Sequence, residues 1–333
     1  MKIALYWKKL KSNSVQCQLC PNFCVIKPEL LGKCGTRKNI NGKLFSIVYG
    51  KPVAANADVI EKKPLYHFLP GSLSFSIATI GCNLFCKHCQ NWEISRASFF
   101  EVPEITPEEI VQEAKENGCS SIAYTYTEPT VFYEYMLDIA KLAKKQGLKN
   151  VIVSNAYINE EPLAELCKYI HAANIDLKAM NEKFYKKICS AKLQPVLEAI
   201  KLLFEKKIWL EITNLVIPKK NDSQASITKL VNWILENLGQ DVPLHFSRFF
   251  PAYKMLNLQP TPVEKLIKAK EIALQKGMKF VYIGNILAKE HNSTYCPNCK
   301  ELLIERSALF VESIKLKQGK CPKCGTKIPG VWQ

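Results

Sequence analysis

Apolar and polar positions alternate in blocks through the middle of the chain. Short apolar runs rich in β-branched residues are separated by stretches whose apolar positions recur every three or four residues. The runs indicate buried strands and the spaced positions indicate amphipathic helices. Strands are expected at 74–80, 121–126, 150–155, 173–178, 208–218, 243–249 and 280–285, and helices at 105–118, 129–147, 160–170, 181–189, 193–206, 227–239 and 263–277.

Seven strands in series, separated by helices, predict an α/β fold with a parallel sheet. We expect a partial or full β/α barrel (TIM-like) whose active site lies at the C-terminal ends of the strands. Two cysteine-bearing flanks have few helix signals. The expected domains are an N-terminal four-Cys metal module (1–70), the barrel (71–289) and a C-terminal zinc ribbon (290–333).

The composition is that of an ordinary globular protein, with 47% hydrophobic and 23% charged residues in 333. No apolar run approaches the roughly 20 residues that span a bilayer, and the start lacks the apolar segment of a signal peptide. We therefore expect a cytoplasmic protein with no membrane partner. The net charge of +16 favours acidic partners, such as an acidic protein or RNA, although lysines spread over a solvated surface would give the same value.

Fourteen cysteines need an explanation in a cytoplasmic chain, where thiols stay reduced. Clusters of them indicate metal sites rather than disulfides. Three cysteines stand alone (Cys119, Cys167 and Cys189), and we interpret them as small buried apolar residues. The other eleven form three groups: Cys17, Cys20, Cys24 and Cys34; Cys82, Cys86 and Cys89; and Cys296, Cys299, Cys321 and Cys324.

The central group follows the first expected barrel strand in the loop GCNLFCKHCQNW. Its thiolates, Cys82, Cys86 and Cys89, can converge on one metal centre. A four-iron cluster bound by three cysteines keeps one iron open, as catalytic metal sites do. An open iron suits the reductive cleavage of S-adenosylmethionine (SAM), whose amino and carboxylate groups can chelate it. The alternatives are a zinc site completed by His88, or free thiols.

The loop GCNLFCKHCQNWEIS resembles the radical SAM superfamily in its cysteine spacing and in the ring of His88 before the last cysteine. More narrowly, the chain resembles relatives of the pyruvate formate-lyase activating enzyme. Within them it is similar to the branch of the AmmeMemoRadiSam system, named after its AMMECR and Memo partner proteins. The resemblance covers essentially the whole chain, including CQLCPNFCVI…GKCGTR near the start and CPNC…CPKCGTKIPGVW at the end.

The resemblance implies a 4Fe–4S cluster on catalytic Cys82, Cys86 and Cys89, with SAM as the second cofactor. The reduced cluster would cleave SAM to methionine and a 5′-deoxyadenosyl radical, which abstracts hydrogen from an unidentified substrate. The alternative is a glycyl-radical enzyme activase acting on a partner protein. The implied partners are a ferredoxin- or flavodoxin-type electron donor and AMMECR-like and Memo-like proteins. A non-enzymatic zinc-ribbon protein that binds nucleic acid is the rival from another class.

SAM ligands are expected at the ends of later strands. Thr127 and Glu128 follow the second strand, where the family carries Gly-Gly-Glu, so only Glu128 maps onto the family pattern. A carboxylate facing the SAM ammonium would form a charge-assisted hydrogen bond, and the alternative is a helix N-terminal Glu. By resemblance, Asn155 can reach the ribose or methionine end, and Asp176 and Lys178 match the Asp-Leu-Lys stretch near SAM. An Asp–Lys ion pair inside the barrel is the alternative for the last two. His88 completes the expected cofactor-binding set. Weaker candidates at strand ends are Glu211, Thr213, Asn214, His245, Ser247, Arg248 and Asn285. Either His245 or Arg248 could orient the substrate, but a lone strand histidine is more often a core residue, so His245 is given no catalytic role.

The two flanking cysteine groups each offer four ligands. The C-terminal group has two Cys-x-x-Cys knuckles with strand-like LLIERS and LFVESIKL between them, the layout of a structural zinc ribbon. An iron–sulfur or rubredoxin-like iron site is its competitor. The N-terminal group is unevenly spaced and predicts zinc or a second cluster, which could relay electrons. Gly32 and Gly35 would let the backbone fold tightly around Cys34.

Overall fold

The computed structural model describes residues 1–97 and 102–333, and its centre is one eight-stranded sheet. The strand order is β14-β13-β12-β11-β10-β9-β8-β7, in which β8 to β14 run parallel and β7 antiparallel. The seven expected strands are therefore confirmed, in sequence order. They are β8 (Leu73–Ala78), β9 (Ser121–Tyr124), β10 (Lys149–Ser154), β11 (Ala172–Asp176), β12 (Trp209–Val216), β13 (Leu244–Arg248) and β14 (Val281–Gly284).

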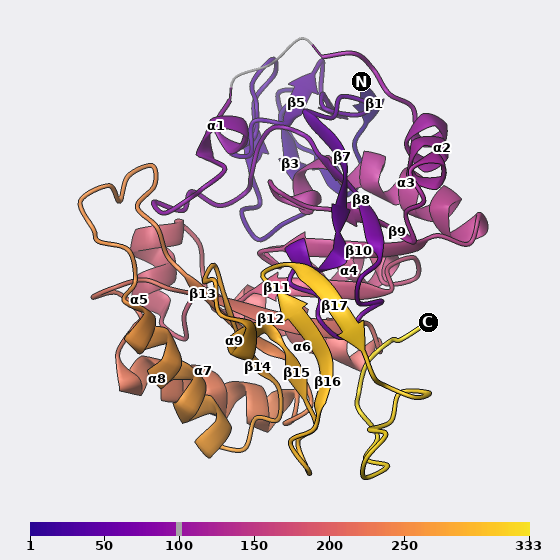
Figure 1. The fold of residues 1–333 in the computed structure, drawn as a ribbon. Helices are drawn as coiled ribbons and strands as arrows, with labels where there is room; N and C mark the ends of the chain where they lie inside the picture. The colour runs from indigo at the N-terminus through magenta and orange to yellow at the C-terminus, as the bar shows by residue number, and fades with distance from the viewer. Residues whose placement is uncertain (98–101) are drawn as a thin grey trace.

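Helices connect the parallel strands and flank the sheet (Figure 1). The first long one begins at a capping box, in which Thr106 and Glu109 bond each other's backbone N–H. One expected helix, 181–189, divides into a short helix and a π-helical turn that ends at Ser190, whose φ is 56°. The helices are α1 (Trp92–Ser95), α2 (Pro107–Glu116), η2 (Pro129–Phe132), α3 (Tyr133–Lys145), α4 (Glu160–Leu166), α5 (Glu182–Phe184), η3 (Tyr185–Cys189), α6 (Gln194–Glu205), α7 (Gln224–Asn237), α8 (Val263–Gln275) and α9 (Lys289–Asn292).

The sheet is an open barrel, because β7 (Ala54–Val59) and β14 form its two edges and do not pair within the described part of the chain. After β7 and the short helix η1 (Ile60–Lys62), the chain reaches the sheet again. Leu65 and Phe68 pack against Ala123 and Val151 of the sheet. The structure thus joins β7 to the barrel sheet, although the sequence pattern groups this strand with the N-terminal module.

The N-terminal module consists of two three-stranded sheets, β1-β6-β5 and β2-β3-β4. Ile40 and Lys43 pair across a two-residue turn, and its residues Asn41 and Gly42 both have positive φ, as a tight hairpin requires. The strands are β1 (Lys2–Ile3), β2 (Trp7–Lys9), β3 (Val15–Cys17), β4 (Val25–Ile26), β5 (Arg37–Ile40) and β6 (Lys43–Ser46).

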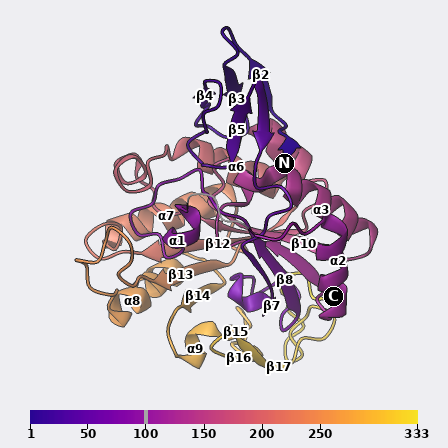
Figure 2. The ribbon, with the colours of Figure 1, turned by 90° about the horizontal axis from the view of Figure 1, so that it is seen from above.

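The C-terminal ribbon is an antiparallel sheet of β15 (Thr294–Tyr295), β16 (Leu302–Ser307) and β17 (Phe310–Ile314). It confirms the two strands expected between the cysteine knuckles. The ribbon and the N-terminal module lie on opposite sides of the barrel (Figure 2).

Each flank is joined to the barrel by a buried arginine–glutamate pair. Arg37 of the N-terminal module pairs with Glu134 of α3, and both side chains are almost fully buried. Arg306 of β16 pairs with Glu61 of η1 at 3.3 Å, and both are fully buried. Buried charges are stable only when paired and hydrogen-bonded, so each pair fixes the position of its flank. No helix in residues 1–97 and 102–333 is long and apolar enough to cross a bilayer.

Candidate functional site

A cavity of about 320 Å³ lies at the C-terminal ends of the parallel strands, where the barrel fold was expected to place the site. The loop after β8 supplies all three central cysteines to its lining. The ends of β9 to β13 supply most of the rest of the wall. Most of the residues expected from the sequence are therefore brought together: Cys82, Cys86, His88, Cys89, Thr127, Glu128, Asn155, Asp176 and Lys178 all line the cavity.

The cysteine loop is held by its own backbone against the turn that follows α5. Phe85 N–H donates to the Cys189 carbonyl at 2.9 Å, and Lys87 N–H donates to the Ile188 carbonyl at 2.9 Å. The Arg96 guanidinium lies 4.0 Å over the Phe85 ring. These contacts fix the loop in a single conformation without using the cysteine sulfurs.

The central thiols lie in surroundings that disfavour free thiolates. Burial raises the pKa of Cys82 well above its usual range. A hydrogen bond with Cys189, together with burial, raises the pKa of Cys86. Metal centres bind the thiolate form, so the charge of a bound centre has to stabilise these sulfurs. Cys82 and Cys86 therefore fit a cationic metal centre better than they fit reactive free thiols.

Within residues 1–97 and 102–333, His88 has no hydrogen-bond partner on either ring nitrogen, although it is only 4% exposed. Burial, aided by the charge of Lys178, lowers the pKa of His88 to about 3, so its ring is neutral at physiological pH. Buried polar atoms in native proteins are nearly always hydrogen-bonded. The two nitrogens line the cavity and lack protein partners, which points to a polar molecule that binds beside them.

Glu128 ends the loop after β9 and is 1% exposed. Its Oε1 accepts three hydrogen bonds, from Thr130 N–H at 3.1 Å, Thr130 Oγ1 at 2.7 Å and Ser154 Oγ at 2.8 Å. Its Oε2 accepts one, from Asn155 N–H at 2.9 Å, and so keeps room for another donor. Burial raises the pKa of Glu128 despite these donors, and a cation beside Oε2 would offset that effect.

Asn155 and Thr127 are tied to neighbouring loops. Asn155 Nδ2 donates to Asn83 Oδ1 at 3.0 Å and lies 3.8 Å from Cys82 Sγ. Thr127 Oγ1 donates to the Thr79 carbonyl at 2.9 Å. Hydrogen bonds to ligand sulfurs tune a cluster's potential, so this amide can act on a metal centre at Cys82 without touching SAM.

Asp176 and Lys178 form the ion pair that the sequence left as the alternative, with Nζ and Oδ2 3.0 Å apart. Although burial opposes the charge, Asp176 and the nearby Cys86 raise the pKa of Lys178 well above its usual value. Lys178 is therefore a fixed positive charge beside the cysteine loop. Asp176 is more exposed than Lys178 and lines the cavity as well.

The weaker strand-end candidates divide into three groups. Thr213 and Ser247 line the cavity. Glu211 and His245 instead bond each other, Oε2 to Nε2 at 2.7 Å, and Glu211 also accepts from Tyr66 and His67 N–H. Burial opposes ionisation of Glu211, but the hydrogen bond and charge of His245 hold its pKa below the usual value. The histidine is a satisfied interior residue, as the sequence interpretation has it.

The other weak candidates serve neighbouring loops. Asn214 Nδ2 donates to the Leu177 carbonyl at 2.7 Å, and Arg248 Nε donates to the Thr261 carbonyl at 2.8 Å. Asn285 Nδ2 donates to Ser247 Oγ at 3.0 Å. These side chains position the loops at the strand ends.

Sequence reasoning missed two residues beside the site. Cys189, interpreted as a buried apolar residue, ends the π-helical turn η3 against the cysteine loop and contributes to the raised pKa of Cys86. Lys62 lines the cavity although it lies outside the barrel range expected from the sequence. Neither position stands in a motif, so only the tertiary structure could reveal them.

A second cavity of about 680 Å³ adjoins the first, and both are lined by Lys62, Thr213 and Ser247. Leu309 of the ribbon forms part of its wall, and Leu287, 95% exposed, marks its mouth. The space between barrel and ribbon therefore leads from solvent to β12 and β13, whose residues Thr213 and Ser247 also line the cavity of the cysteine loop.

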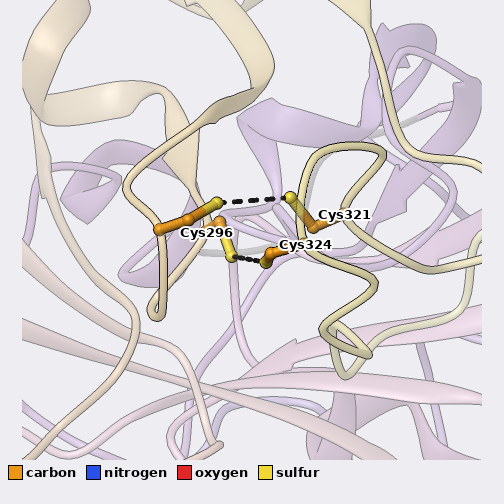
Figure 3. A group of neighbouring side chains, drawn as sticks. Cys296, Cys321 and Cys324 are labelled. Atoms are coloured by element: carbon orange, nitrogen blue, oxygen red, sulfur yellow. Dashed lines mark hydrogen bonds between the residues drawn. The ribbon is translucent and has the colours of Figure 1, made fainter.

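The C-terminal cysteines form a closed four-thiol site (Figure 3). All four Sγ atoms lie within 4.8 Å of one another, and the pairs Cys296–Cys324 and Cys299–Cys321 are 3.6 Å apart. Tetrahedral Zn–S bonds of about 2.3 Å place sulfurs roughly 3.8 Å apart. This group fits one zinc or iron ion and supports the zinc ribbon.

Comparisons with known proteins match the part of the chain that carries the central cysteine loop. Residues 76–231 match the family model of the radical SAM superfamily. An uncharacterized protein of Methanocaldococcus jannaschii is 46% identical and is aligned over 98% of this chain and 99% of its own. A putative glycyl-radical enzyme activating enzyme of the same organism is 28% identical, over 63% of this chain and 78% of its own. A pyruvate formate-lyase-activating enzyme of Clostridium pasteurianum is 25% identical, over 60% and 87%.

Among solved structures, SuiB of Streptococcus suis bound to SAM superposes with a TM-score of 0.51 at 17% identity. The superposition covers 68% of this chain and 53% of that chain. SuiB bound to its precursor peptide SuiA gives a TM-score of 0.52 at 16% identity, over 68% and 51%. At these identities the likeness shows a shared fold, and this chain spans about half the length of SuiB.

Proposed function

The chain belongs to the radical SAM superfamily, and we propose that it cleaves SAM reductively to abstract a hydrogen atom from a substrate that enters between barrel and ribbon. As a member of this family it is an enzyme that uses a 4Fe–4S cluster and SAM. The observation that carries the proposal is the cavity in which three cysteines, Cys86 buried and the other two half-buried, meet the free acceptor of Glu128 and the ring of His88, which has no partner within the described residues.

Cys82, Cys86 and Cys89 would hold the cluster, because three thiolates leave one iron of a cubane open. When bound, the reduced cluster and SAM supply a 5′-deoxyadenosyl radical that removes a hydrogen atom from the substrate. The protein's part is to bind, orient and shield. The loop contacts from Phe85 and Lys87 to the turn at residues 188–189 keep the three sulfurs aimed into one cavity.

The charged and polar groups of the cavity are complementary in charge to the methionine part of SAM. Glu128 Oε2 would accept from the ammonium of its methionine part, a charge-assisted hydrogen bond. Lys178 would attract the carboxylate, which then competes with Asp176 for the Lys178 ammonium. The neutral ring of His88 would receive the adenine edge, which offers both donors and acceptors to its two open nitrogens.

A protein substrate is the more specific candidate, favoured by the second cavity. Its volume of about 680 Å³, its exposed mouth and its three shared residues would admit an extended peptide segment as far as the cysteine loop. The activating-enzyme relatives support this reading, in which a glycine of a partner protein loses hydrogen. The same reading requires a ferredoxin- or flavodoxin-type donor. AMMECR-like and Memo-like partners are proposed from the sequence resemblance alone.

The test is anaerobic reconstitution with iron and sulfide, followed by dithionite and SAM. The wild-type chain should release 5′-deoxyadenosine and methionine, whereas Cys86→Ser should lose the part of the cluster absorbance that the triad contributes and reduce deoxyadenosine to background. Cys167→Ser, which alters a half-buried cysteine outside the three groups, is the matched control and should behave as wild type. Wild-type deoxyadenosine release by Cys86→Ser would refute the assignment.

The same assay tests the substrate. Candidate proteins carrying α-deuterated glycine should transfer deuterium into deoxyadenosine, which mass spectrometry detects. Transfer from a labelled small molecule, with none from labelled protein, would reject the protein reading and leave SAM cleavage intact.

A further inference from the structure

The four N-terminal cysteines line one small cavity inside the N-terminal module. Its remaining wall is mostly apolar, with Leu19, Ile26 and Val131 among its residues. Strand β3 and the turn after it carry Cys17 and Cys20, and Cys17 N–H donates to the Cys24 carbonyl at 3.0 Å. Gly35, with φ of 78°, turns the chain directly after Cys34. Four thiols around one enclosed space form a complete ligand set for a metal centre.

The spacing of the sulfurs separates this set from the C-terminal ribbon. The ribbon gathers four Sγ atoms within 4.8 Å, as a single ion requires. Across residues 1–97 and 102–333, neither the N-terminal set nor the central triad gathers three sulfurs so closely. In an iron–sulfur cluster, irons and sulfides stand between the thiolates, so the cysteine sulfurs lie farther apart. The N-terminal set thus resembles the triad, whose family binds a cluster, rather than the ribbon.

The N-terminal cavity lies directly behind the loop of the central triad. Asn83, the neighbour of Cys82, lines it, and Asn22 Nδ2 donates to the Asn83 carbonyl at 2.9 Å. A Cβ added to Gly81 would lie 2.6 Å from the Cys34 carbonyl oxygen. The loops of the two cysteine groups are therefore in contact. Of the two neighbours of Cys82, Asn83 forms part of the wall of the N-terminal cavity and Gly81 lies against Cys34.

A buried arginine faces the N-terminal thiols. Arg37 Nη1 lies 3.7 Å from Cys17 Sγ, and Nη2 pairs with Glu134 of the barrel. Cys34 Sγ lies 3.2 Å from Thr36 Oγ1, whose hydroxyl donates to the Val131 carbonyl. A cation beside the ligands offsets part of the negative charge that four thiolates bring to a cluster.

We propose that Cys17, Cys20, Cys24 and Cys34 bind a second iron–sulfur cluster, placed to exchange single electrons with the centre on the triad. The electron comes from a low-potential one-electron donor protein, which is oxidised as the N-terminal cluster is reduced. Passing it to the triad's centre reoxidises the N-terminal cluster, and no covalent bond forms or breaks. The location rests on the N-terminal residues alone, and the electron exchange rests on the proposed function of the triad.

The first experiment removes the triad and leaves the N-terminal set intact. The full chain with Cys82, Cys86 and Cys89 all changed to serine is reconstituted anaerobically, and iron, acid-labile sulfide and zinc are counted. We expect iron and sulfide in equal amounts, about two or four of each per chain, and one further metal ion in the ribbon. Zinc in place of this iron, iron without sulfide, or an empty site would each overturn the proposal.

The matched variant changes Cys20 and Cys24 to serine with the triad intact, and should lose the same number of irons that the triad-free chain retains. Ribbon metal content and far-ultraviolet circular dichroism report whether each variant has folded. Electron paramagnetic resonance then tests proximity, because two reduced clusters at neighbouring loops broaden each other's signals. We expect that broadening in the wild type and its loss in either variant. A wild-type spectrum equal to the sum of the variants would overturn the electron exchange while leaving the second cluster in place.

Discussion

Arg306 carries the attachment of the ribbon to the barrel, and replacing it should loosen the ribbon selectively. Its fully buried guanidinium donates to the Tyr66 carbonyl at 2.6 Å and to Thr294 Oγ1 at 2.8 Å. It also lies 4.4 Å over the Tyr66 ring and 3.3 Å from a carboxylate oxygen of Glu61. Arg306→Met keeps most of the side-chain volume and removes every one of these polar interactions.

The expected loss of stability follows from the unpaired charge that the substitution leaves on Glu61. Breaking a buried ion pair costs about 3–5 kcal/mol, because the remaining charge is uncompensated. The distance of 3.3 Å is longer than the roughly 2.7–2.9 Å of a strong charge-assisted bond, which favours the lower end, about 3 kcal/mol. Glu61 would keep the Gly71 N–H, at 3.1 Å, but no longer a cationic partner in Arg306. Adding Glu61→Gln removes the stranded charge and should recover roughly half of the loss.

The pH dependence has a definite sign. Burial already raises the pKa of Glu61, although the charge of Arg306 opposes this, and loss of Arg306 raises the pKa further. An acid with a raised pKa in the folded state is destabilising when ionised and harmless when protonated. The penalty of Arg306→Met is therefore complete above the folded pKa. It shrinks as the pH falls toward the unfolded value of about 4.5.

Hydrogen exchange of the metal-loaded protein measures the effect where it occurs. A loss of about 3 kcal/mol predicts on the order of 100-fold faster exchange in β16 and β17, with β10 as the internal reference. Lys315→Met is the control, because Lys315 and Glu301 form a solvent-exposed pair at 3.9 Å that contributes little. If the amides of β16 and β17 exchange at the wild-type rate in Arg306→Met, or exchange equally faster in Lys315→Met, the buried pair does not hold the ribbon.

Two further predictions concern the same side of the molecule. Removing the ribbon metal with a thiol-competing chelator should unfold β15–β17 and leave the barrel's circular dichroism intact, since so small a module depends on its metal; full protection of ribbon amides in metal-free protein would contradict this. Burial lowers the pKa of His67 to about 4, so the folded state favours the neutral ring. Above about pH 6.5 the ring is neutral in both states and costs no stability. As the pH drops to 4, the free energy of unfolding should fall by about 3 kcal/mol, because the unfolded state binds the proton more tightly. Denaturant unfolding of His67→Gln across this range should show a shallower acid dependence, and an identical slope would reject the assignment.

The barrel was predictable because its signals are local. Each parallel strand is an apolar run, and each helix has its own cap or period, so the seven strands and their order follow from the chain alone. The three central cysteines lie within eight consecutive positions, so a single loop brings them together. Because strand ends of a parallel sheet share one edge, Glu128, Asn155 and Asp176 were predictable neighbours of that loop.

What the sequence did not show depends on tertiary contacts. β7, AANADV, is a half-buried edge strand whose apolar face is Ala55, Ala57 and Val59, and a face made largely of alanine gives only a weak alternating signal. The approach of Cys189 to Cys86 depends on a π-helical turn, which has no sequence signature of its own. The sequence also does not show which acceptors are already occupied by protein donors, as Glu128 Oε1 is by three hydrogen bonds.

The two flanks are parts of the working site rather than appendages to it. Leu309 of the ribbon walls the cavity through which we propose that substrate enters, and Arg306 sets where that wall stands. On the other side, Arg37 fixes the N-terminal module while facing Cys17, and Cys34 packs against the residue that precedes Cys82. A substitution that loosens one flank should therefore alter substrate access, whereas one that loosens the other should alter electron supply. Both effects are expected because each flank packs directly against the sheet or the cysteine loop of the open barrel.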